Sequence, residues 1–169
     1  MKGRQILLDH LQGREAAALM IDGQLSDLLI DGDAPRPGTV YTGMVDRQVR
    51  GQGGVFIKTP DGSAYLRGVR RITQGEMLHV QVTGYAELGK AIPVTHKLLF
   101  KSRYAIVTPD AAGLNLSRSI RDDNVRDRLM LVAHEAMEGS KMGLILRSVS
   151  AEANPDDIVD DITAMRKLA

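Results

Sequence analysis

The chain has 169 residues, of which 43% are hydrophobic and 25% are charged, and its formal net charge is +1. This length fits one ordinary domain or two small ones and is too short for a large multidomain enzyme. The absence of cysteine excludes a disulfide scaffold, a cysteine-ligated metal site and a thiolate nucleophile.

No apolar run approaches the roughly 20 residues that a membrane span needs. The apolar run near the N-terminus is broken by Asp9 after three residues, which is too short for a signal peptide. A cysteine-free chain also fits a reducing compartment. We therefore expect a cytoplasmic protein without a membrane partner.

The small net charge hides a strong asymmetry along the chain. Residues 36–103 carry 11 basic and 4 acidic side chains, whereas residues 1–35 and 104–169 each have a net charge of −3. A basic segment between two acidic ones suggests a polyanion-binding module inserted into another unit. Basic side chains scattered over a solvated surface would give the same counts, so both interpretations stay open.

The first two thirds of the chain predict short strands. Asp22-Gly23 separates two apolar runs and is typical of a two-residue hairpin turn. Residues 31–38 are rich in Gly, Pro and Asp and predict a linker. The basic segment that follows favours a small five-stranded barrel of the OB type. Its strands are expected at residues 39–49, 54–58, 63–67, 77–83 and 91–99.

The last third of the chain mixes strands with helices. A strand is expected to end at Pro109, and apolar residues between 125 and 137 fall on one helical face after Asp122-Asp123. Residues 142–149 predict a buried strand, and Asn154-Pro155 predicts the start of a final helix. The predicted fold class is therefore α+β, with a mixed α/β unit interrupted by the five-stranded OB-fold barrel.

No residue pattern predicts a catalytic centre or a metal site. Residues 84–91 nearly match a phosphate-binding loop, but Ala91 replaces the hydroxyl and a strand follows, so we interpret them as a connection that carries Lys90. The acidic pairs at 156–157 and 160–161 are interpreted as a solvated helix face, because carboxylates spread over two turns do not converge. We assign no catalytic residue, metal ligand or cofactor to this chain.

The predicted barrel carries the best candidates for a binding surface. Phe56 and Tyr65 stand on neighbouring strands, where a shared face would let them stack on RNA bases. The alternative is that Phe56 fills the barrel core. Arg47, Arg50, Arg70 and Arg71 add positive charge nearby. We predict that single-stranded RNA is the partner and that the RNA-binding residues are Phe56, Tyr65, Lys58, Arg67 and Lys90.

Eight short motifs occur in the same order as in the N-terminal part of the ribonuclease E/G family, which the chain therefore resembles. Each motif is weak alone, but their order along nearly the whole chain is specific. They are residues 20–23 (MIDG), 40–45 (VYTGMV), 55–58 (VFIK), 65–66 (YL), 89–95 (GKAIPVT), 102–109 (SRYAIVTP), 117–120 (SRSI) and 143–148 (GLILRS).

The resemblance implies a discontinuous RNase H-like unit, formed by residues 1–36 and 98–169, around an S1-type RNA-binding domain at residues 37–97. It also implies that Arg147 and Ser148 bind the 5′-monophosphate of an RNA. An arginine fork and an adjacent hydroxyl suit a terminal phosphate. Ser148 keeps the hydroxyl of the threonine that the family has there.

The family is a group of magnesium-dependent endoribonucleases in RNA processing and decay, and the chain also departs from it. The family's magnesium-binding aspartates and zinc-link cysteines lie further along its sequence, so we expect magnesium only in a catalytic domain outside these residues and no cleavage by this chain alone. Oligomerisation stays open. We expect the RNA-binding, 5′-sensing portion of such an enzyme. The alternatives are a stand-alone non-catalytic RNA-binding protein and an OB-fold protein-interaction module.

Overall fold

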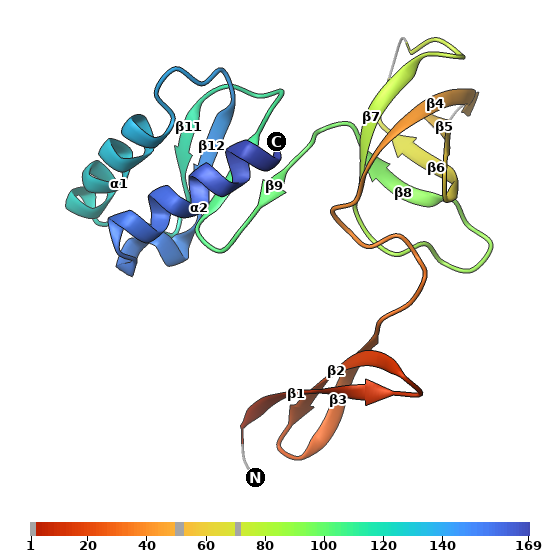
Figure 1. Cartoon of the computed structure of the whole chain (residues 1–169), viewed down its shortest axis with the longest axis horizontal. Helices are drawn as coiled ribbons and strands as arrows, with labels where there is room; N and C mark the ends of the chain where they lie inside the picture. Colours follow the sequence, from red (N-terminus) through yellow and green to blue (C-terminus); the bar gives the residue numbers. More distant parts are fainter. Residues whose placement is uncertain (1–2, 50–52, 70–71) are drawn as a thin grey trace. The chain divides into compact units, whose positions relative to one another are not determined.

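Three β-sheets and two α-helices make up the described part of the chain (Figure 1). The structure is a computed structural model that describes residues 3–49, 53–69 and 72–169. The mixture of helices with a closed five-stranded barrel confirms the predicted α+β class. None of the described helices combines the length and the apolar character that crossing a membrane requires.

The chain divides into two compact units, Met1–Ala34 and Pro35–Ala169. The boundary falls inside the breaker-rich segment that the sequence marks as a linker. The grouping of residues 1–36 with 98–169 in one RNase H-like unit stays a prediction.

The first unit is an antiparallel sheet of β1 (Arg4–Leu11), β2 (Arg14–Ile21) and β3 (Gln24–Ile30), with β2 in the centre. Asp22 and Gly23 have φ angles of 50° and 84°, as a two-residue turn of the I′ type requires. This confirms the predicted hairpin.

Large apolar side chains cover both faces of this sheet. Ile6 and Leu8 are 71% and 79% exposed on one face, and Leu7 and Leu28, on the other, are both about half exposed. Leu7 and Leu28 are the register partners of Ala18 on either side of it, so they share a face. A sheet that is apolar on both faces is typical of a central layer covered from both sides.

The barrel begins the second unit and closes in the order β4-β5-β6-β8-β7. Inward side chains such as Val55, Ile57 and Leu66 are almost completely buried, and their neighbours point outward. This alternation is what the period of two predicts. The five expected strands occur as β4 (Val40–Val49), β5 (Gly54–Thr59), β6 (Gly62–Arg67), β7 (Met77–Val82) and β8 (Ile92–Thr95), but the last was expected to reach residue 99 and ends at Thr95.

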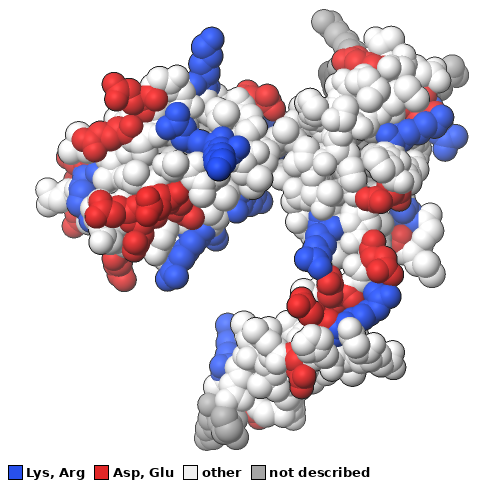
Figure 2. Space-filling model, in the orientation of Figure 1, with Lys and Arg blue, Asp and Glu red and all other residues white. Residues whose placement is uncertain are grey.

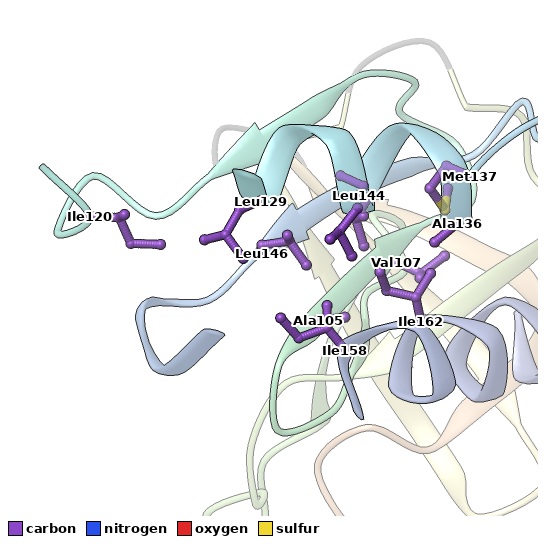
Figure 3. Packing of buried hydrophobic residues seen from close by; sticks show 12 residues of the cluster. Ala105, Val107, Ile120, Leu129, Ala136, Met137, Leu144, Leu146, Ile158 and Ile162 are labelled. Atoms are coloured by element: carbon purple, nitrogen blue, oxygen red, sulfur yellow. The ribbon is translucent and has the colours of Figure 1, made fainter. Parts of the chain in front are cut away.

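A four-stranded sheet and two helices follow the barrel in sequence. The strands lie in the order β11-β12-β10-β9, and side chains of α1, α2 and the central strands point toward one another in a shared core (Figure 3). Leu129, Leu144 and Ile158 have no exposed surface there. The elements are β9 (Phe100–Lys101), β10 (Ala105–Thr108), β11 (Leu114–Leu116), α1 (Asp123–Ala136), β12 (Gly143–Leu146), the 3₁₀ helix η1 (Ser148–Glu152) and α2 (Pro155–Leu168).

The helix starts agree with the predicted capping residues. Asp122 caps α1 by accepting a hydrogen bond from Val125 N at 3.0 Å, and Asn154 caps α2 by accepting one from Asp156 N at 3.1 Å. Pro155 occupies the first turn of α2, where its missing N–H costs nothing. Both predicted helices are therefore confirmed.

Two short elements, β11 and η1, were not predicted. β11 has three residues, too few for a periodic pattern, and it forms by pairing in parallel with β12. Gly143 lets β12 begin close to the end of β10 and the segment after it, because a Cβ atom there would overlap Ala111 O and Thr108 Oγ1. The strand expected at 142–149 ends at Leu146, where η1 takes over after Arg147.

Tyr41 in β4 is 8% exposed and donates a hydrogen bond to Asp61 in the β5–β6 turn. Burial of its hydroxyl, with the hydrogen bond to Asp61 and the negative charge of that residue, raises the pKa of Tyr41 from 10.0 to about 12. Because the folded pKa exceeds the unfolded one, the related stability is complete below about pH 10 and falls as the pH rises toward 12.

We therefore expect one of the four tyrosines to ionise near pH 12 in a spectrophotometric titration and to be missing from the titration of Tyr41→Phe. The free energy of unfolding of the variant should depend less steeply on pH in this alkaline range. Equal slopes for the two proteins in denaturant titrations would contradict this account.

Candidate functional site

Two aromatic side chains lie next to each other on the outer face of the barrel. Phe56 and Tyr65 are register partners, with ring centroids 5.4 Å apart and planes tilted by 50°. Phe56 is half-buried, whereas its neighbours Val55 and Ile57 point into the core. The structure thus brings the predicted pair together and removes the alternative that Phe56 fills the barrel.

The strand register extends this pair into a row across four strands. Arg47 in β4 is opposite Phe56, and Pro93 in β8 is opposite Tyr65. The guanidinium carbon of Arg47 lies 4.9 Å from the Phe56 ring centroid, within cation–π range. We call Arg47, Phe56, Tyr65 and Pro93 the aromatic row. A line of flat side chains edged by a guanidinium suits the stacking of nucleobases.

The Tyr65 ring lies directly against Gly54. A Cβ atom on Gly54 would be 2.5 Å from Tyr65 Oη, 2.7 Å from Tyr65 Cζ and 2.8 Å from Leu66 O, closer than side-chain packing permits. The sequence identified Gly54 only as the start of a strand. Its role becomes visible only when the pairing of β5 with β6 places the tyrosine over it.

The predicted cations lie on the two sides of the aromatic row, displaced from it along the strands. Lys58 is opposite Ser63, and Lys90 comes two residues before Ile92, which pairs with Ala64 on β6. Both lysines therefore lie on the side of the row near the β5–β6 turn. Arg67 is opposite Gly54 and lies on the other side. Arg50, Arg70 and Arg71 lie outside the described residues.

These cations differ in their pairing. Lys58 Nζ is 3.0 Å from Asp46 Oδ1, and Lys90 Nζ is 2.5 Å from Glu87 Oε2. Arg67 is exposed and makes no ion pair with any other residue of the described chain. Exposed pairs contribute at most about 1 kcal/mol, so a phosphate can displace either carboxylate at small cost.

A second group of polar side chains lies where β12 ends. Arg147 and Ser148 follow directly and are exposed. Arg147 N donates to Tyr104 O at 2.8 Å, and one guanidinium nitrogen donates to Ser102 O. The Ser148 hydroxyl makes no hydrogen bond within the described residues. The remaining guanidinium N–H groups and this hydroxyl suit the oxygens of a phosphate.

Arg118 lies at the same edge of the sheet, although it was not predicted as a site residue. β11 and β12 run in parallel with Leu116 opposite Leu146, and Ser117 N donates to Leu146 O at 2.8 Å. Arg118 and Arg147 therefore both follow the carboxyl ends of neighbouring strands. Only the unpredicted pairing of β11 with β12 reveals this.

One interpretation of the acidic pairs was wrong. Figure 2 shows acidic side chains over the two helices, and Asp156, Asp157 and Asp160 are indeed exposed. Asp161 is instead half-buried, and its Oδ2 accepts hydrogen bonds from Ser102 Oγ at 2.5 Å, from Tyr104 N at 2.8 Å and from Ala105 N at 3.2 Å. No group of three or more histidine and acidic side chains that could hold a metal occurs within the described ranges.

Comparisons with known proteins agree with this architecture. Residues 100–169 match the model of the Ribonuclease E/G family. Ribonuclease E from Nostoc sp. is 24% identical over 97% of this chain and 26% of its own length. Ribonuclease E from Synechocystis sp. is 24% identical over 90% and 25%, and ribonuclease G from Escherichia coli K12 is 25% identical over 96% and 38%.

The protein is thus a mixed α+β chain built around an OB-like barrel, similar in sequence to bacterial ribonucleases over nearly its whole length. This similarity supports an assignment to the ribonuclease E/G family, whose model matches residues 100–169. The chain spans about a quarter of the two ribonucleases E and 38% of ribonuclease G.

We expect Gly54→Ala to displace the Tyr65 ring and to destabilise the protein by about 1–3 kcal/mol, as overpacking does. The matched control is Gly84→Ala, because a Cβ atom on Gly84 meets nothing within 4 Å and its φ is ordinary. Thermal melts of both variants would measure the difference. Identical melting temperatures would show that Tyr65 is not held against Gly54.

Proposed function

We propose that this chain is the RNA-binding and 5′-monophosphate-sensing N-terminal portion of a ribonuclease E/G-like endoribonuclease that acts in RNA processing and decay. The observation that carries the proposal is the aromatic row on the outer face of the barrel. We also propose a cytoplasmic location, as the composition of the chain leads us to expect. Magnesium-dependent cleavage is assigned to a catalytic domain outside residues 1–169.

Single-stranded RNA would bind across the aromatic row. Two bases stack on Phe56 and Tyr65, while the Arg47 guanidinium adds a cation at the edge of the first ring. Lys58 and Lys90 lie on one side of the row and Arg67 on the other, where they contact the sugar-phosphate backbone. Stacking tolerates any base, so this surface favours general affinity over sequence recognition.

The 5′ end of the RNA would be selected at the end of β12. A terminal phosphate offers oxygens that match the free side of the Arg147 guanidinium, and Ser148 donates a further hydrogen bond. Arg118, at the same sheet edge, adds positive charge. A 5′-hydroxyl end lacks the charge and is discriminated against.

We expect Phe56→Leu to weaken binding of single-stranded RNA by about 1–3 kcal/mol, or roughly 5- to 150-fold, because leucine has no aromatic face. The control is Met77→Ala, which truncates an exposed apolar side chain on β7, away from the aromatic row. Fluorescence anisotropy at several salt concentrations measures both variants. A folded Phe56→Leu protein with unchanged affinity would contradict the stacking role.

The same titrations separate RNA binding from the protein-interaction alternative. Phosphate contacts release counterions, so RNA affinity must fall as salt rises. No measurable binding of RNA at low salt would favour the OB-fold protein-interaction module.

Arg147→Ala is expected to remove the preference for 5′-monophosphorylated over 5′-hydroxyl RNA. The difference in binding free energy that is lost should be about 1.5–3 kcal/mol, the contribution of a charged hydrogen bond. Affinity for the 5′-hydroxyl oligonucleotide should stay the same, because the aromatic row lies on another sheet. Arg121→Ala, which removes an equal charge from an exposed position, is the control. A wild-type protein with no preference would refute the sensing part of the proposal.

A further inference from the structure

The turn between β9 and β10 holds Arg147 at two points. Its guanidinium donates to Ser102 O, and its backbone N–H donates to Tyr104 O at 2.8 Å. The backbone hydrogen bond fixes where the exposed side chain begins, and the hydrogen bond to Ser102 O directs its guanidinium. One arm of the guanidinium fork is occupied by a neutral carbonyl, and the other N–H groups remain available.

The same turn also fixes the residues that follow Arg147. Ser150 is completely buried, and its hydroxyl donates to Tyr104 O at 2.9 Å. Ser150 belongs to η1, which begins with Ser148. The placement of the Arg147 and Ser148 side chains thus depends on the placement of residues 102–104.

Asp161 in α2 is what holds this turn. Its Oδ2 accepts hydrogen bonds from Ser102 Oγ, Tyr104 N and Ala105 N, at 2.5, 2.8 and 3.2 Å. The helix that carries it is anchored on either side by Ile158 and Ile162, both without exposed surface. Hydrogen bonds to an ionised carboxylate are about twice as strong as neutral ones. Removing the carboxylate would leave Tyr104 N without a partner and Ala105 N with only its 3.3 Å hydrogen bond to Ser102 Oγ.

We propose that Asp161 is a positioning residue for Arg147 and thereby for recognition of the 5′-phosphate. This inference rests on the proposed function for its ligand. The Asp161 carboxylate does not pair with the Arg147 guanidinium. Such an ion pair would neutralise the positive charge that binds a phosphate. It acts through the Ser102 carbonyl, which orients Arg147 and leaves its positive charge available to the anion.

The first test compares Asp161→Ala with Asp160→Ala in the full chain. Both remove one negative charge from neighbouring positions of α2, but Asp160 is exposed and makes no hydrogen bond with its side chain among the described residues. The ratio of affinities for 5′-monophosphorylated and 5′-hydroxyl oligonucleotides should fall about tenfold in Asp161→Ala. The size of this effect is taken by analogy from metal sites, where removal of a residue that orients a ligand lowers affinity by a similar factor. It should stay at the wild-type value in Asp160→Ala, and binding of the 5′-hydroxyl RNA should be equal in both.

The second test needs no RNA and therefore separates this inference from the proposed function. The Nε–Hε signal of Arg147 in NMR spectra reports how firmly the side chain is held. We expect it to be ordered in the wild-type protein and mobile in Asp161→Ala. If the wild-type protein has no 5′ preference, the sensing function fails, but this signal still decides whether Asp161 positions Arg147.

Ser102→Ala provides a second variant in case Asp161→Ala does not fold. It removes the side-chain donor to Asp161, together with the hydrogen bonds of this hydroxyl to Ala105 O and from Ala105 N, and it keeps the two backbone hydrogen bonds to Asp161. A smaller loss of Arg147 order and of 5′ preference is expected. Folded variants in which the Arg147 signal is as ordered as in the wild-type protein would overturn the proposal.

Discussion

The alternation of side chains along β5 and β6 is the constraint on which the binding surface depends. Because successive side chains of a strand point to opposite faces, the residues next to an inward residue such as Ile57 or Leu66 lie on the outer face. The pattern that fills the core therefore also places the aromatic pair on the outside. A shift of register by one residue would bury the pair and expose the core. Gly54 adds a local condition, because it leaves room for the Tyr65 ring. The surface is therefore as well ordered as the barrel.

The two surfaces that we propose for RNA affinity and for 5′-end selection rest on different physics. The aromatic row offers apolar area, and two of its neighbouring lysines already have carboxylate partners, Asp46 and Glu87. The edge beyond β12 offers charge instead, with Arg118 and Arg147 free of ion pairs among the described residues. Stacking is tolerant of sequence, whereas a guanidinium fork distinguishes a phosphate from a hydroxyl. In the proposed function, the aromatic row therefore binds RNA of any sequence, and the edge beyond β12 distinguishes a 5′-phosphate from a 5′-hydroxyl.

Local signals predicted much of this architecture, and long-range pairing explains what they missed. The sequence predicts the turn at Asp22-Gly23 and the helix starts at Asp122 and Asn154. Such features are predictable because caps and turns depend on residues within a few positions of each other. Pro93 and Arg118 reach their sites through parallel strand pairs whose partners no local pattern reveals. The pairing of Phe56 with Tyr65 could be predicted from the sequence, because their strands are consecutive in the chain.

Asp161 shows where composition misleads. A run of aspartates on a helix is usually solvated, and three of its four members here are exposed. The position of Asp161, three residues after the buried Ile158 and next to the buried Ile162, places it at the margin of the packed face. A carboxylate at that margin can turn inward only if it finds donors, and the turn after β9 supplies three. The hydrogen-bonding demand of an irregular turn thus determines which acidic residue of the helix is structural.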